Sequence, residues 1–143
     1  MAARGAAQGA IEPLVDLLEH DDDDVRHNAV WALSFLADSK PWCKCIINRK
    51  AVPILVQMLR SDNNSAMQEY AAEIFYHFSY IDGSLDYERD AVECGIIPNL
   101  VTLLQDENAR DLSKVYAMRG LSDVCNDTQA FKSKFLLCEG GVE

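Results

Sequence analysis

The sequence predicts an all-α fold, a right-handed solenoid in which about three units of three helices each stack along one axis. Two observations lead to this prediction. A short apolar segment containing a proline and a Leu-Val pair recurs three times, and each copy is followed by a longer amphipathic segment. The copies begin 41 and 45 residues apart. Periods of this length are typical of helical solenoids.

The three short segments read GAIEPLVDLLEHD from Gly9, KAVPILVQMLRSD from Lys50 and GIIPNLVTLLQDE from Gly95. Apolar residues recur in each at helical spacing. Proline is tolerated in the first turn of a helix because an amide hydrogen there has no intrahelical acceptor. We therefore expect three short helices, each with its proline in the first turn.

The longer segments span residues 25–37, 67–79 and 113–125, and we expect a helix in each. Apolar and small residues recur at i, i+3, i+4 and i+7, which predicts one buried stripe per helix. Aligned, these positions are Ala29, Ala71 and Ala117; Ala32, Ile74 and Gly120; Leu33, Phe75 and Leu121; Leu36, Phe78 and Val124. Acidic and capping residues at 21–24, 61–65 and 106–108 precede the helices, where the helix dipole favours them.

A third, shorter helix is expected before each later short segment. Its apolar pairs are Ile46-Ile47, Ala91-Val92 and Leu136-Leu137, with turns marked by the region of Pro41 and by Gly83. The chain is thus expected to be a single domain, 1–143. Its units are approximately 1–40, 41–82 and 83–127, with a partial fourth at 128–143.

The composition of the chain limits the kinds of partner and of function that are expected. A formal net charge of −10 and a pI of about 4.6 argue against nucleic-acid partners and favour neutral or basic ones. No apolar run is long enough for a membrane span, so we expect a soluble protein of the cytoplasm or nucleus. The five scattered cysteines indicate buried thiols rather than a disulfide framework.

No motif for catalysis, a cofactor or a metal ion is found, so we expect a protein that is not an enzyme. The three histidines fall in different units, and His77 is expected to pair with Glu73 four residues earlier. The acidic run 21–24 lacks the spacing and the central glycine of a calcium loop. We expect it to be a solvated turn that caps the following helix.

The stretch GAIEPLVDLLEHDDDDVRHNAVWALSFLA resembles the second and third helices of an armadillo repeat, and ECGIIPNLVTLL resembles a first helix leading into a second. The similarity extends over nearly the whole chain. HEAT repeats are the alternative, but they have two helices per unit rather than three. The resemblance implies that the third helices line the concave face of a superhelix, along which extended peptides bind.

In importin-α-like members a Trp and an Asn, one turn apart on the third helix, form the binding ladder. The Asn amide holds the peptide backbone, and the Trp face packs on Lys or Arg side chains. Here the positions that match the Trp hold Trp31, Glu73 and Arg119. Those that match the Asn hold Phe35, His77 and Asp123. The missing Asn ladder argues against standard recognition of nuclear localisation signals.

One turn before these positions the same helix face carries Asn28, Tyr70 and Tyr116. Together the nine residues form the predicted groove, for which a peptide or protein segment is the expected partner. Three hypotheses stay open, namely a peptide-binding module, an import adaptor for basic signals and a self-assembling scaffold. Self-association would run through open solenoid ends, with Phe131, Phe135, Leu136 and Leu137 at the C-terminal one; the alternative is a last helix that folds back and caps its own stack.

Overall fold

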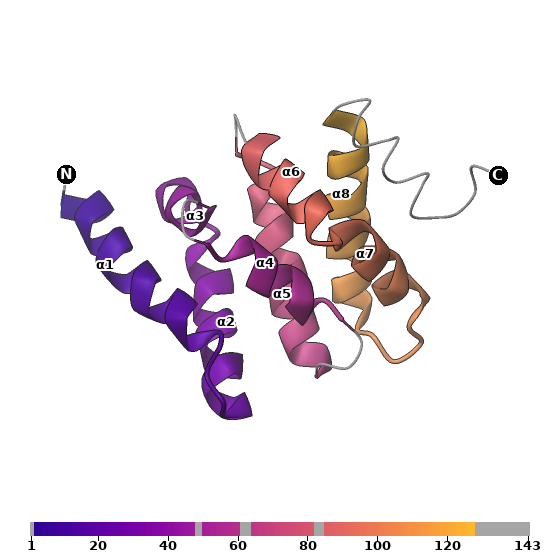
Figure 1. Cartoon of the computed structure of the whole chain (residues 1–143), viewed down its shortest axis with the longest axis horizontal. Helices are drawn as coiled ribbons and strands as arrows, with labels where there is room; N and C mark the ends of the chain where they lie inside the picture. Colours follow the sequence, from indigo (N-terminus) through magenta and orange to yellow (C-terminus); the bar gives the residue numbers. More distant parts are fainter. Residues whose placement is uncertain (1, 48–49, 61–63, 82–84, 128–143) are drawn as a thin grey trace.

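The computed structural model describes residues 2–47, 50–60, 64–81 and 85–127. These residues form eight α-helices and no strand (Figure 1). The helices are α1 (Ala2–Leu17), α2 (Asp23–Leu36), α3 (Lys40–Ile47), α4 (Val52–Met58), α5 (Ser65–Phe78), α6 (Leu85–Glu93), α7 (Ile96–Gln105) and α8 (Asp111–Asp127). The expected fourth unit, with Phe131, Phe135, Leu136 and Leu137, lies outside the described residues.

Helices α4 and α7 correspond to the second and third short segments. Pro53 and Pro98 lie in their first turns, which confirms the expectation for these two helices. Gly95 precedes α7 with a φ of 95°, a left-handed conformation that favours glycine.

The expectation for the first short segment was wrong. Pro13 lies inside α1, a continuous helix of 16 residues that begins at Ala2. The Ala-rich sequence before Pro13 favours a helix strongly, and this propensity extends the helix towards the N-terminus. Pro41 likewise lies in the first turn of α3 rather than in the turn before it.

The longer segments form α2, α5 and α8, and their apolar stripe is largely buried. In α5 the four stripe positions Ala71, Ile74, Phe75 and Phe78 are at most 2% exposed. Ala32 is only half-buried, whereas its counterparts Ile74 and Gly120 are buried. α8 likewise packs against only one long helix, but Leu100 of α7 lies against Gly120, whereas the surroundings of Ala32 on α2 are more open.

Capping residues begin two of the long helices. The carboxylate of Asp22 accepts a hydrogen bond from the amide of Asp24 at 2.8 Å, and the amide oxygen of Asn64 accepts one from Met67 at 2.8 Å. The acidic run therefore caps α2, as its sequence predicts, and Asp23 forms an ion pair with Arg26.

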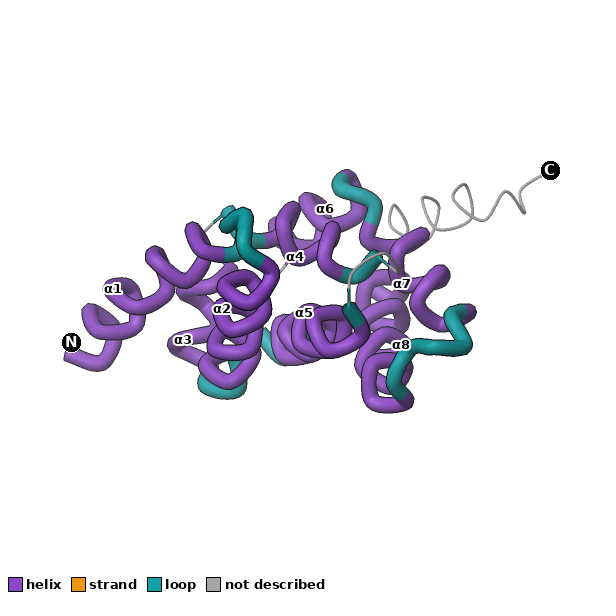
Figure 2. Tube along the Cα trace, turned by 90° about the horizontal axis from the view of Figure 1, so that it is seen from below, coloured by secondary structure: helices purple, strands orange, loops and turns teal. Residues whose placement is uncertain are grey.

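The units stack through the long helices, with α5 packed against α2 on one side and α8 on the other. Figure 2 shows α5 and α8 on one side of the molecule and α4, α6 and α7 on the other. Hydrogen bonds between the units add to this stacking. The Asn99 side chain donates to the Val56 carbonyl at 2.9 Å and joins α7 to α4. Arg110 donates to Glu69 at 3.2 Å and joins the start of α8 to α5.

Candidate functional site

The long helices lie in a row, with α5 between α2 and α8 (Figure 1). We call the side of these helices that carries the predicted groove residues the ladder face. Each helix contributes three of the residues that the sequence predicts for the groove. These residues are Asn28, Trp31 and Phe35 on α2; Tyr70, Glu73 and His77 on α5; and Tyr116, Arg119 and Asp123 on α8. None of the nine is fully buried.

The α2 part of the ladder face is apolar and open. The Trp31 side chain is 52% exposed, and the Phe35 side chain, one turn later, is 80% exposed. Asn28 is exposed, but its amide nitrogen already donates to the Asp24 carbonyl at 2.9 Å. This end of the face therefore offers aromatic surface rather than a free amide.

The α5 part is more polar and more enclosed. Glu73 and His77 lie 3.4 Å apart, as their i, i+4 spacing predicts, and both side chains are at most a quarter exposed. Tyr70 is half-buried, and its ring meets His27 of α2 edge-on, with 5.6 Å between ring centroids. Tyr70 therefore also holds α5 against α2, and its ring is only partly open to a partner.

On α8, two predicted residues contact the preceding unit. The Tyr116 ring lies 5.0 Å from the ring of Tyr76, and the Arg119 guanidinium lies over the Tyr80 ring, 4.7 Å from its centroid. Burial, followed by the nearby charges of Glu73 and Glu69, raises the pKa of the Tyr116 hydroxyl. Asp123 is half-buried on the same face.

Sequence reasoning missed Tyr76 and Tyr80, which link α5 to α8. The Tyr80 hydroxyl donates to the Tyr76 hydroxyl at 3.5 Å, and this bond is the main reason that the pKa of Tyr76 is raised. The sequence signal is their i, i+4 spacing at the end of α5. The aligned residues in α2 and α8 are aromatic at neither position, so the repeat alignment did not reveal these tyrosines.

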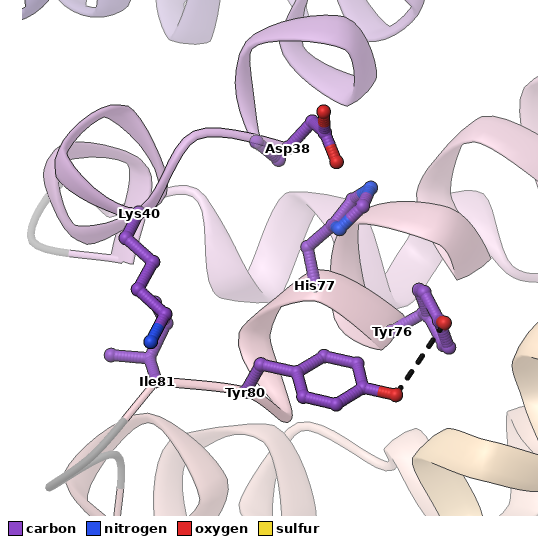
Figure 3. A pocket seen from close by; sticks show the side chains of 7 residues that line it. Asp38, Lys40, Tyr76, His77, Tyr80 and Ile81 are labelled. Atoms are coloured by element: carbon purple, nitrogen blue, oxygen red, sulfur yellow. Dashed lines mark hydrogen bonds between the residues drawn. The ribbon is translucent and has the colours of Figure 1, made fainter.

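A pocket of about 240 Å³ opens beside these tyrosines, between the ends of α2 and α5 and the start of α3. Figure 3 shows the Tyr80 ring along one wall, with Lys40 and Asp38 on the side of α2 and α3. The lining residues are Ala37, Asp38, Lys40, Tyr76, His77, Tyr80 and Ile81. The pocket is wide enough for a single side chain of a partner, and its walls carry both charges.

The described residues offer no cluster of three or more histidine, cysteine or acidic side chains that could hold a metal ion. Burial raises the pKa of the Cys43 thiol to about 12, so this thiol stays protonated at neutral pH. None of the helices in the described part of the chain is long and apolar enough to cross a membrane.

Comparison with known proteins supports the repeat assignment. Residues 6–38 match the family described as Armadillo/beta-catenin-like repeat. The chain is 33% identical over 103 residues to importin subunit alpha-2 of Arabidopsis thaliana. It is 33% identical over 100 residues to importin subunit alpha-1a of Oryza sativa subsp. japonica. These alignments include 71% and 68% of the chain, but they span only 18% of each relative.

Solved structures with the same fold include designed armadillo proteins. One, computationally designed for modular peptide recognition, superposes with a TM-score of 0.77 over 92% of the chain and 53% of its own length, at 23% identity. Another, in complex with the peptide (KR)4, gives a TM-score of 0.75 with the same coverage and identity. The chain is therefore an all-α solenoid that belongs to the armadillo-repeat family, with local similarity to the repeats of importin α.

Proposed function

We propose that the chain is a non-enzymatic binding module whose ladder face holds an extended peptide or protein segment. The main support is the pair of exposed aromatic side chains on α2, Trp31 and Phe35, in register with further aromatic and charged residues on α5 and α8. Exposed aromatic residues at regular spacing are typical of binding hot spots. Two of the armadillo structures above are described as a design for peptide recognition and as a peptide complex.

The chemistry of the face sets the class of partner. Phe35 offers apolar surface where an importin-like ladder has an amide, so side-chain contacts rather than backbone clamping supply most of the affinity. The net charge of −10 and the carboxylates of Glu73 and Asp123 favour neutral to basic segments. The cytoplasm and nucleus are the compartments in which such a module would act.

Peptide selection followed by NMR mapping tests this function. A random peptide library is screened against the chain, and the best peptide is titrated into 15N-labelled protein. We expect amide shifts on α2, α5 and α8 and little change on α3 and α6, which line no part of the ladder face. Shifts confined to α3 and α6 would contradict the proposal. Enrichment of paired Lys/Arg clusters would favour the import adaptor, and aromatic or aliphatic anchors would favour a different partner.

Self-association is a second candidate, and an apolar stripe on α8 supports it. Leu112, Val115 and Met118 are 46%, 50% and 53% exposed. The counterparts of Met118 are Val30 in α2 and Ala72 in α5, both at most 1% exposed, in helices that each pack against the next long helix. The stripe thus aligns with the residues that other long helices bury between neighbouring units. In a self-associated form, the end of a second copy that carries α2 would cover it.

A sedimentation experiment tests the second candidate. The wild-type chain is expected to show mass that increases with concentration, and the Val115→Lys, Met118→Lys variant to stay monomeric, because two buried charges would oppose the contact. Thr102→Lys, an exposed change on α7, is the control and should associate like the wild type. A wild-type chain that stays monomeric at high concentration would exclude self-association.

A further inference from the structure

Arg119 occupies an unusual position on the ladder face. Its guanidinium lies over the ring of Tyr80, 4.7 Å from the centroid, so α8 reaches across to the end of α5. This is the geometry in which an aromatic face binds a cation. The Tyr80 side chain is 45% exposed and Arg119 is also exposed, so the contact lies at the surface where a partner would bind.

The surroundings of Tyr80 could bind a cation from the protein itself or from a partner. The Tyr76 ring lies 5.3 Å from that of Tyr80 and 5.0 Å from that of Tyr116, so three aromatic rings cluster between α5 and α8. Glu73 and Glu69 supply negative charge at the Tyr116 end of this cluster, since both raise the pKa of Tyr116 in addition to its burial. Glu69 also pairs with Arg110, and Glu73 with His77. Without Arg119, the exposed face of the Tyr80 ring would remain, with the two carboxylates at the Tyr116 end of the cluster.

The residues that align with Arg119 on the other long helices differ from it in how they interact with cations. Trp31 stands at this position in α2 and Glu73 in α5, and each of these residues attracts a cationic side chain. Arg119 instead brings a cation of the protein itself. The third unit would therefore repel a Lys or Arg side chain of a peptide where the first two would accept it.

We propose that Arg119 is a specificity-determining residue that occupies a cation-binding site on the Tyr80 ring and excludes Lys and Arg side chains of a bound peptide from the third unit. The inference rests on the proposed peptide-binding function of the ladder face. A peptide that binds across all three units should then place its basic residues on α2 and α5 and a neutral or acidic residue beside Arg119.

The test measures the affinity of the peptide (KR)4 for the wild type and five variants at one fixed salt concentration. Arg119→Ala should bind it about fivefold more tightly than the wild type, since a cation–π contact at an exposed site corresponds to about that factor. Removing any positive charge also favours a basic peptide. Lys114→Ala is therefore the matched control, because Lys114 lies on α8 but points about 140° away from Arg119. Arg119→Lys keeps the charge and should stay close to the wild type.

The Tyr80 ring provides the decisive comparison. Tyr80→Ala combined with Arg119→Ala should bind (KR)4 no more tightly than Lys114→Ala does, because only the effect of the removed charge remains once the ring is gone. Equal affinities for Arg119→Ala and Lys114→Ala, a gain beyond that of Lys114→Ala that survives Tyr80→Ala, or no binding of (KR)4 by Arg119→Ala would each overturn the inference. The Trp31→Ala, Phe35→Ala variant separates the two proposals. If this variant binds (KR)4 more weakly than the wild type but Arg119→Ala does not bind it more tightly, this inference is refuted and the proposed function stands.

Discussion

Replacing Phe75 by Ala is expected to lower the free energy of unfolding by about 3–5 kcal/mol. The Phe75 side chain is 2% exposed. It meets the ring of Phe78 edge-on at 5.5 Å and stacks on Tyr87 of α6 at 6.4 Å. Truncation would leave a cavity between α5 and α6 and remove both aromatic contacts. For a domain of this size such a loss is a large part of the total stability.

Phe35→Ala is the matched control, since it makes the same chemical change on a neighbouring long helix. The Phe35 side chain is 80% exposed, so its truncation is expected to change stability by no more than about 0.5 kcal/mol. Urea unfolding followed by circular dichroism at 222 nm measures both variants. Equal midpoints for the two would show that the assignment of buried and exposed faces on the long helices is wrong.

Much of this fold could be predicted from the sequence because the repeat itself carries the information. Three aligned copies show which positions stay apolar, and a period of 3.6 residues turns those positions into one buried stripe. Ile74 and Phe78 were identified in this way, and both are fully buried. The alignment assumes equivalent surroundings, however, and it was wrong for Ala32, which is only half-buried although its counterparts Ile74 and Gly120 are buried.

The contacts of the candidate site were harder to predict. Aligning the long helices gives the positions on the ladder face, and all nine lie on α2, α5 and α8. The Arg119–Tyr80 contact depends on the distance between α5 and α8 and on the path of the chain after α5. Neither quantity repeats in the sequence, so only the structure reveals that a predicted groove residue contacts the preceding unit.

Removing both aromatic side chains from α2 is expected to have the largest effect on binding. Truncation of a single hot-spot aromatic residue typically costs 2 kcal/mol or more, which corresponds to about a 30-fold loss of affinity. Trp31 and Phe35 stand one turn apart and are 52% and 80% exposed, so a peptide that packs on one contacts the other. We therefore expect the Trp31→Ala, Phe35→Ala variant to bind the selected peptide at least 30-fold more weakly while its helical content stays unchanged.

Val115→Ala with Met118→Ala is the control for this loss. It removes two half-exposed apolar side chains from α8, and neither of them is one of the nine ladder-face residues. Its affinity for the peptide should match that of the wild type. A similar loss in both variants would indicate a general effect of exposed apolar surface instead of a site on α2.

Isothermal titration calorimetry of the selected peptide against the wild type and the Trp31→Ala, Phe35→Ala variant, in one buffer, tests peptide binding on the ladder face most directly. We expect a dissociation constant at least 30-fold higher for the variant, with circular dichroism spectra that superimpose. Equal dissociation constants, within a factor of two, would contradict it and place the binding site elsewhere on the solenoid.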